Sequence, residues 1–182
     1  MAVLSNTQIH ELAIGYYSWT KLISPYDSTM VNPASIDLTL SQKLLRLKRQ
    51  PSYVALDPKA AIEYEPANKE GDSMYCIAPG EFILGSINET ITLPNNIAGQ
   101  VHGKSSLGRL GLAIHVTAGW VDPGWCGKLT LEIVNHSSSY IVLHKDMRIC
   151  QIVFHTLDQP ANPGYQGRYQ GDTDTTGSRY GE

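Results

Sequence analysis

The stretch GKSSLGRLGLAIHVTAGWVDPGWCGKLTLEIVN, residues 103–135, contains the clearest strand pattern in the chain. In its last part, KLTLEIVN, leucine or isoleucine occupies every second position, which places these side chains on one face of a strand. The turn-forming pair Pro123-Gly124 precedes this strand. The pattern indicates β-structure with one apolar face.

Similar patterns occur on both sides of this stretch, with β-branched or aromatic residues at alternating positions and Pro or Gly between them. A single short helix is predicted at 5–14, with Ser5 as its cap. Many short strands with regular turns predict a mainly β fold, either a β-barrel or a jelly-roll-like sandwich. The expected strands are 35–47, 81–87, 91–94, 97–103, 112–119, 128–135, 140–145 and 147–157.

The ends of the chain differ in composition. Residues 1–157 carry the strand patterns, so they are predicted to form one β domain, with 48–76 as a polar surface excursion. Residues 158–182 are rich in Gly, Pro, Gln, Thr and Tyr and have almost no aliphatic side chains. Composition alone favours a disordered end for this tail, and a flap that orders over a ligand is the alternative.

Composition also argues against several functions. The formal net charge of −3 argues against a dedicated nucleic-acid surface. No apolar run could span a membrane and the N-terminus lacks the features of a signal peptide, so we expect a cytoplasmic protein. Cys76, Cys126 and Cys150 lie far apart without a P-C-x-x-C motif, which argues against the zinc site of the usual nucleoside deaminases.

The loop from Gly103 to Arg109 could bind phosphate. Its small residues let the backbone approach an anion, its hydroxyl and N–H groups donate, and Lys104 and Arg109 supply positive charge. It lacks the spacing of a Walker loop. A Ser/Gly turn between a strand and a helix is the simpler alternative, and the loop's own residues leave both open.

Two carboxylates follow this loop. Asp122 precedes Pro-Gly and has an ordinary use in turns. Glu132 lies among apolar residues of a strand, so it either faces solvent or is a buried carboxylate that could act as a general base. The pattern alone favours the solvent-facing position.

These motifs resemble the dCTP deaminase branch of the trimeric dUTPase-like superfamily. GKSSLGRLGL resembles the motif G-[RK]-S-S-L-[AG]-R-L-G-L, and HVTAGWVDPGWCGKLTLEIVN resembles the block H-x-T-A-[HG]-x-[IV]-D-P-G-[FW]-x-G-x-[IL]-x-L-E-x-x-N. Elements at 32–38, 79–85, 147–152 and 168–171 resemble the family's other motifs in the same order, over nearly the whole chain. The resemblance implies a dUTPase-like β-barrel or jelly-roll-type fold with a short N-terminal helix. It also implies a flexible C-terminal flap at 158–182 over the nucleotide.

The resemblance implies a zinc-independent deamination. Glu132 would be the general base for a water that attacks C4 of cytosine, and Ser105 would lie beside that water. Arg109 would support Glu132 and meet phosphate oxygens. Asp122 would face the deoxyribose and its 3′-hydroxyl.

The resemblance also implies substrate contacts, a metal and an assembly. Mg²⁺ would bind chiefly through the triphosphate, without a dedicated protein site. The assembly would be a homotrimer with active sites between subunits, and dTTP is a candidate inhibitor. The implied substrate-binding residues are Lys104, Ser106, Thr117, Ala118, Gly119, Trp120, Gln151, Tyr165, Arg168, Tyr169 and Gln170.

Two chemistries occur in this branch: deamination to dUTP alone, and deamination coupled to triphosphate cleavage, which gives dUMP and pyrophosphate. Gly119-Trp120 resembles the bifunctional members, so dUMP formation for dTTP supply is expected, with Asp122 also helping to activate the water at the α-phosphate.

The alternatives are a monofunctional dCTP deaminase, a plain dUTPase and a non-catalytic nucleotide sensor. A plain dUTPase has no need of Glu132. The sequence departs from the family pattern at the flap, where the family often has Gln or Arg at 172 or 173. Two acids near a triphosphate, here Asp172 and Asp174, are unfavourable unless they face solvent or a metal.

Overall fold

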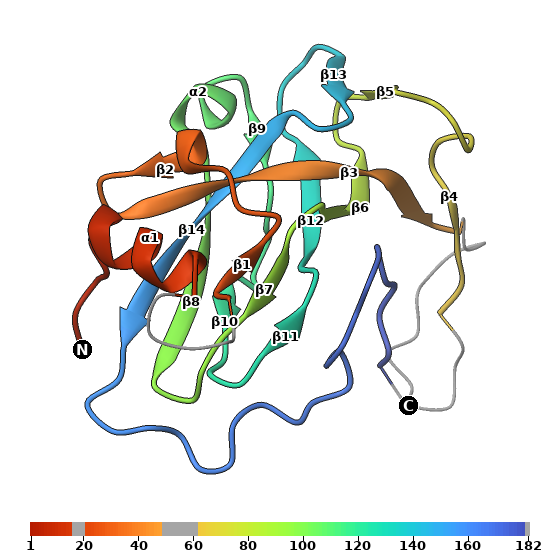
Figure 1. Ribbon diagram of the computed structural model, residues 1–182. Helices are drawn as coiled ribbons and strands as arrows, with labels where there is room; N and C mark the ends of the chain where they lie inside the picture. Colours follow the sequence, from red (N-terminus) through yellow and green to blue (C-terminus); the bar gives the residue numbers. More distant parts are fainter. Residues whose placement is uncertain (16–20, 49–61, 181–182) are drawn as a thin grey trace.

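The computed structural model describes residues 1–15, 21–48 and 62–180, and its fold is mainly β, as the sequence predicts (Figure 1). The helices are α1 (Asn6–Ala13), the 3-10 helix η1 (Ser28–Met30) and α2 (Ser105–Gly108). The strands are β1 (Ile23–Ser24), β2 (Val31–Asn32), β3 (Ser35–Leu47), β4 (Tyr64–Pro66), β5 (Met74–Ile77), β6 (Phe82–Ile87), β7 (Thr90–Thr92), β8 (Ile97–Gly103), β9 (Leu112–Ala113), β10 (Trp120–Val121), β11 (Cys126–Gly127), β12 (Thr130–Asn135), β13 (Ile141–His144) and β14 (Arg148–Thr156).

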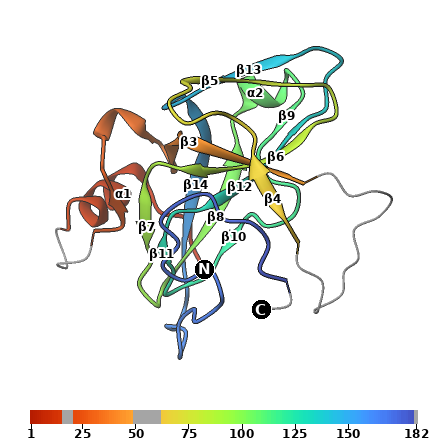
Figure 2. The same ribbon diagram turned by 90° about the vertical axis from the view of Figure 1, so that its right-hand side faces the viewer.

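The main sheet is antiparallel and strongly curled, and β3 is its longest strand. The strands follow the order β10-β8-β14-β3-β6-β12-β9, with β2 and β4 also paired to β3. The first half of β3 pairs with β14 and its second half with β6, so it joins the two halves of the sheet. Two small sheets, β1-β7-β11 and β13-β5, complete the fold, and the latter lies at one end of the molecule in both views (Figures 1 and 2).

The core lies inside this curled sheet. Leu131 and Ile133 are buried on β12, as the alternation predicts, and Phe154 is fully buried on β14. Residues 35–41 of β3 are all buried, so both faces of this part of the strand are covered, which explains its partial alternation.

Helix α1 confirms the predicted N-terminal helix. Ser5 Oγ accepts a hydrogen bond from Gln8 N at 3.5 Å, and Gln8 Oε1 accepts one from Ser5 N at 3.0 Å. This capping box satisfies backbone donors at the start of the helix. The helix buries Ile9 and Ala13 against the core.

The predicted strand at 112–119 is wrong beyond β9. Val116 N and Thr117 N donate to the side chain of Glu132 instead of to a neighbouring strand. A carboxylate thus takes the donors that a sheet ladder would need.

The predicted excursion at 48–76 is only partly irregular. Within it, β4 pairs with β3 and β5 pairs with β13, while 49–61 lie outside the described residues. Both strands are short, and the partners that stabilise them are distant in sequence.

The C-terminal tail contacts the sheet instead of leaving it. It runs along the lower edge of Figure 1 and rises between β11 and β4. Asp172 and Thr175 are buried, and Lys128 N donates to the carbonyl oxygen of Asp172 at 2.7 Å. Hydrogen bonds, together with the packing of Tyr165 and Tyr169 against the core, therefore hold the tail on the sheet, contrary to the disordered end that composition favours.

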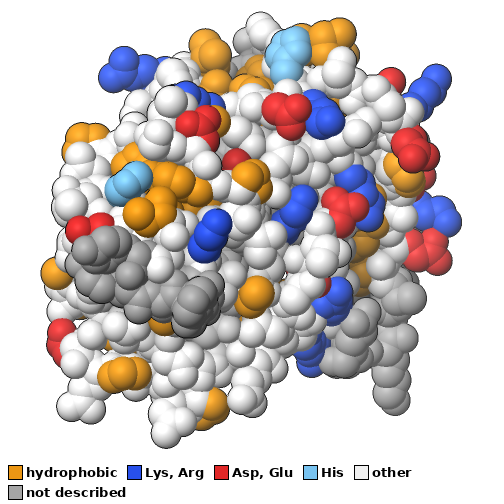
Figure 3. Space-filling view, viewed as in Figure 1, with side chains coloured by type: hydrophobic (Ala, Val, Ile, Leu, Met, Phe, Trp, Pro, Cys, Tyr) orange, Lys and Arg blue, Asp and Glu red, His pale blue; other side chains and the backbone are white. Residues whose placement is uncertain are grey.

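Two surface properties bear on function. Among the residues that the structure describes, no helix is long and apolar enough to cross a membrane. On the face shown in Figure 3, basic and acidic side chains are interspersed instead of forming one basic patch.

Candidate active site

A cavity of about 370 Å³ lies between β12, β6, the segment 115–125 and the C-terminal tail. Its lining combines three carboxylates, Glu132, Asp122 and Asp172, with several aromatic rings. Such a cavity could hold a planar ring together with a small number of directed polar groups. The aromatic lining residues are Tyr64, Phe82, Trp120, Trp125, Tyr165 and Tyr169.

Glu132 is the most firmly oriented carboxylate of this cavity. It lies on β12 opposite Leu84 of β6, on the face away from the core, and is half-buried. Its Oε2 accepts hydrogen bonds from Val116 N at 2.7 Å and Thr117 N at 3.0 Å. Among the described residues, none donates to Oε1, which leaves that oxygen available to a water. Glu132 is therefore neither fully solvent-facing nor fully buried, and it can act as a base inside a cavity.

Asp122 follows β10 and is exposed at the edge of the cavity. Its Oδ1 accepts a hydrogen bond from Trp120 Nε1 at 3.1 Å, and its carbonyl oxygen accepts one from Trp125 N at 3.2 Å. Asp122 therefore forms the predicted turn and also lines the cavity. The Trp120 ring in turn lies 5.9 Å from the His155 ring, between centroids.

The segment before Asp122 contacts the cavity mainly through its backbone. Ala118 lines the cavity, and Thr117 orients Glu132 through its N–H group. Gly119 packs closely, since an added Cβ would lie 3.2 Å from the carbonyl oxygen of Val101. Thr117, Ala118 and Gly119, which the resemblance places near the cytosine ring, thus lie together beside the cavity.

The loop predicted to bind phosphate forms a second patch. Ser105, Ser106 and Arg109 are exposed on or next to α2, which follows β8. Lys104 donates to Asp37, with Nζ 2.6 Å from Oδ2. Gln151 lies on β14, where its Nε2 donates to the carbonyl oxygen of Gly103 at 3.1 Å.

Asp37 anchors this patch, and the sequence assigned it no role. It is 3% exposed, and its Oδ2 also lies 3.5 Å from Arg148 Nη1. Its other oxygen accepts a hydrogen bond from Asn32 Nδ2 at 2.9 Å. The only signal was its place in the Asn32–Leu38 element, which indicated a family motif but not a partner.

The structure thus divides the predicted site into two parts. Glu132, Asp122, Ala118 and Trp120 line the cavity, whereas the loop and Gln151 are not part of its lining. Among the described residues, the Glu132 side chain accepts hydrogen bonds from two backbone N–H groups and not from Ser105 or Arg109.

The tail contributes cavity walls and anchoring contacts. Tyr165 and Tyr169 line the cavity, and the Tyr165 ring lies 5.4 Å from the buried Trp125 ring. Gln170 accepts from Cys126 N at 3.0 Å and donates to Gly124 O at 2.9 Å. Gln170 thus fastens the tail to the sheet instead of lining the cavity.

The remaining tail residues pair with one another or with the sheet. Arg168 donates to the carbonyl oxygen of Arg179 at 2.7 Å. Asp172 pairs with Arg179 at 2.9 Å and Asp174 with Lys43 at 3.3 Å, so both acids have a cation beside them. The sequence flagged these acids as unfavourable but did not identify their partners.

The three cysteines are free thiols: Cys76 and Cys126 are exposed and Cys150 is buried. Burial raises the pKa of the Cys150 thiol above its ordinary value, so it stays protonated and unreactive. In the described ranges, no group of three or more His, Cys, Asp or Glu side chains could hold a metal ion.

Comparisons with known proteins agree with this geometry. The sequence model of the dCTP deaminase-like family matches residues 3–157. The chain is 40% identical over 181 residues to "dCTP deaminase, dUMP-forming" of Coprothermobacter proteolyticus, covering 97% of this chain and 95% of that protein. It is 41% identical over 187 residues to the protein of the same name in Acidothermus cellulolyticus, covering 97% and 94%.

A solved structure supports the fold. The 2′-deoxycytidine 5′-triphosphate deaminase of Agrobacterium tumefaciens superposes with a TM-score of 0.64 at 23% identity. The match covers 85% of this chain but only 47% of that longer chain, and at this identity it bears on fold alone. The family match over residues 3–157 and the 40% identity to a relative covered over 95% of its length show that the chain belongs to the dCTP deaminase-like family.

Proposed function

We propose that this protein is a dUMP-forming dCTP deaminase, which converts dCTP and two waters into dUMP, ammonia and pyrophosphate. The observation that carries the proposal is the Glu132 carboxylate, held in an aromatic-lined cavity by two backbone N–H groups. Relatives about 40% identical over most of the chain bear the name of this activity.

In the deamination step, Glu132 acts as the general base. A water beside Oε1 attacks C4 of the cytosine ring while this oxygen takes its proton. Glu132 passes this proton to N3 and then carries the remaining proton of the new C4 hydroxyl to the amino group, so that ammonia leaves as the C4 carbonyl forms. Val116 N and Thr117 N hold the carboxylate during these transfers, which limits its reorganisation.

Triphosphate recognition requires the second patch. Ser105, Ser106 and Arg109 offer hydroxyls and a guanidinium to phosphate oxygens. Because the patch is not part of the cavity lining of its own chain, we propose that it completes the cavity of a neighbouring copy in a homotrimer. Lys104 already donates to Asp37, so it chiefly shapes the loop and adds its charge at a distance.

The remaining parts of the proposal concern the metal, the tail and regulation. Mg²⁺ accompanies the triphosphate, bound by phosphate oxygens and waters. Residues 158–182 act as a flap, with Tyr165 and Tyr169 against the nucleotide and Arg168 near its charged end. Asp122 faces the deoxyribose and helps to activate the water at the α-phosphate. We expect dTTP to compete for the same cavity, and the cytoplasm is the compartment that holds these substrates.

The test is a product assay with dCTP and Mg²⁺, followed by separation of the nucleotides. We expect dUMP and pyrophosphate without accumulation of dUTP. Accumulation of dUTP alone would indicate a monofunctional deaminase. If dCTP remains intact but added dUTP is cleaved, the protein is a plain dUTPase. If both nucleotides survive, the protein is a non-catalytic binder. EDTA should stop turnover, and a zinc-specific chelator should not.

The shared site has its own test. Glu132→Gln and Arg109→Ala proteins should each be inactive, and co-assembly of the two should restore part of the activity. Rescue requires some cavities to combine an intact Glu132 of one copy with an intact Arg109 of another. Absence of rescue in co-assembled trimers would show that both residues act within one chain.

A further inference from the structure

Four tail residues, which we call the tail clasp, join residues 168–172 of the C-terminal segment to Arg179. The clasp consists of Arg168, Tyr169, Asp172 and Arg179. Arg179 Nη2 lies 2.9 Å from Asp172 Oδ1, and Arg179 Cζ lies 5.3 Å from the centre of the Tyr169 ring. Arg179 N donates to the Tyr169 hydroxyl at 3.0 Å. Arg168 and Arg179 each donate from the guanidinium to the other's carbonyl oxygen.

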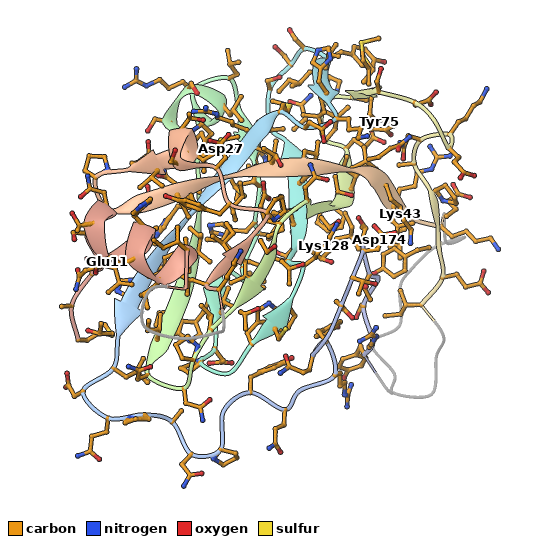
Figure 4. All side chains as sticks on the ribbon, viewed as in Figure 1. Glu11, Asp27, Lys43, Tyr75, Lys128 and Asp174 are labelled. Atoms are coloured by element: carbon orange, nitrogen blue, oxygen red, sulfur yellow. The ribbon has the colours of Figure 1, made fainter. Side chains whose placement is uncertain are left out.

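Asp172 links the clasp to the sheet. Its carbonyl oxygen accepts from Lys128 N at 2.7 Å, next to the cavity (Figure 4 labels Lys128). Gly127 lies directly beneath it with φ +153°, and an added Cβ there would lie 2.9 Å from the same carbonyl oxygen. The close contact of backbone with backbone fixes Asp172 relative to β11.

The Asp172–Arg179 ion pair is largely withdrawn from water. The Asp172 side chain is 7% exposed and that of Arg179 is 29% exposed. Removing the Arg179 guanidinium would leave the buried Asp172 carboxylate without this cation, which is far more unfavourable than losing a surface pair. The pair can therefore hold the tail in one arrangement.

Further contacts dock the tail beyond the clasp. Asp174 Oδ2 lies 3.3 Å from Lys43 Nζ, on the side of β3 seen in Figure 4. Thr175 Oγ1 donates to the carbonyl oxygen of Lys43 at 2.6 Å, and Thr176 N donates to Thr130 Oγ1 at 3.2 Å. The tail's carboxylates thus bind cations of their own chain, which removes their repulsion toward an anionic ligand.

Two clasp residues, Tyr169 and Asp172, line the cavity, and Tyr169 is the one that presents an aromatic ring to it. The Tyr169 ring lies against the Arg179 guanidinium and its hydroxyl accepts from Arg179 N. We infer that the Asp172–Arg179 pair positions Tyr169 over the cavity before a nucleotide binds. Both are positioning residues, and the inference rests on the proposed function for the identity of that nucleotide. Preorganisation of this kind lowers the ordering cost of binding.

The test combines amide hydrogen exchange without nucleotide and steady-state kinetics with dCTP. The variants are Asp172→Asn, Arg179→Gln, their double variant and Arg179→Lys. Arg46→Gln is the matched control, because Arg46 forms an exposed pair with Glu65 at 2.7 Å outside the tail.

We expect the single variants to accelerate amide exchange in residues 169–176 by about tenfold. This factor lies between the effect of breaking an exposed ion pair and that of breaking a buried one. KM for dCTP should rise by a similar factor, with kcat changed less than about twofold, because the ion pair acts on binding and not on the reacting atoms. The double variant should be no worse than Arg179→Gln alone, because that substitution already removes the ion pair, together with the ring contact to Tyr169 and the bond to the Arg168 carbonyl oxygen. Arg179→Lys should recover part of the effect, and Arg46→Gln should behave as the unmodified protein.

Unchanged exchange and KM in both single variants would overturn the inference, as would effects that multiply to about a hundredfold in the double variant. If the unmodified protein does not turn over dCTP, the proposed function fails, and the exchange measurement alone then decides on the tail clasp.

Discussion

Replacement of Glu132 by glutamine should separate the chemistry from the architecture of the cavity. Glutamine has the same length and keeps one oxygen that can accept from Val116 N and Thr117 N, now 2.7 and 3.0 Å from the carboxylate. A neutral amide cannot take the proton of the attacking water. General-base catalysis contributes a factor of about 10² to 10⁴, so the rate of ammonia release should fall by that factor, which corresponds to roughly 3–5 kcal/mol in the activation barrier.

The effect on binding and folding should be much smaller. Both hydrogen bonds persist but lose their charged acceptor, and a hydrogen bond to a charged group exceeds a neutral one by about 1 kcal/mol. We therefore expect the free energy of unfolding to fall by no more than about 2 kcal/mol. The dissociation constant for dCTP should change by less than about tenfold, because a change of that size corresponds to only about 1.4 kcal/mol.

The assay is single-turnover release of ammonia, with dCTP affinity measured by calorimetry and unfolding by urea. Glu132→Ala is the control for architecture: it should lose the same turnover and also release the 115–118 segment, visible as faster exchange of the Val116 and Thr117 amides. Ammonia release by Glu132→Gln within about threefold of the unmodified rate would exclude Glu132 as the base, because general-base catalysis contributes much more than that.

Three further predictions concern the tail, the core and pH. Gly127→Ala should displace the tail, since its Cβ would lie 2.9 Å from the Asp172 carbonyl oxygen, and amide exchange in residues 169–176 should rise. Its φ of +153° also strains an alanine, so the free energy of unfolding in urea should fall as well. Phe154→Ala removes a fully buried ring and should lower the free energy of unfolding by about 3–5 kcal/mol in urea titrations. Burial and the Glu81 carboxylate raise the pKa of Tyr75 to about 12 from its ordinary 10.0, so the folded state holds this proton more tightly than the unfolded state. Stability should therefore fall as pH rises from 10.0 to about 12, and Tyr75→Phe should remove that part of the decline. An equal decline in both proteins would contradict this assignment.

Local features of the fold could be predicted from the sequence. The strand predicted at 97–103 is β8 with the same bounds, and the helix capped by Ser5 forms as expected. Both follow from interactions between near neighbours in the chain, namely side-chain alternation and a cap. The strand predicted at 112–119 failed because Glu132, a distant residue, takes its backbone donors.

The candidate site shows the same distinction. The sequence motifs identified Glu132 and Asp122, and both line the cavity. The motifs did not reveal that Lys104 is bound by Asp37, which is 67 residues away in the chain.

The sequence by itself determined the β class, the N-terminal helix, the family and the carboxylates of the cavity, because each depends on residue type and short-range spacing. Tertiary structure alone decided which backbone groups hold Glu132, that the loop 103–109 lies outside the cavity lining, and that Arg179 pairs with Asp172 in the tail. These contacts depend on the curvature of the sheet and on how closely distant backbone segments approach, as at Gly127. Such distances arise only when the whole chain is packed, so no local pattern contains them.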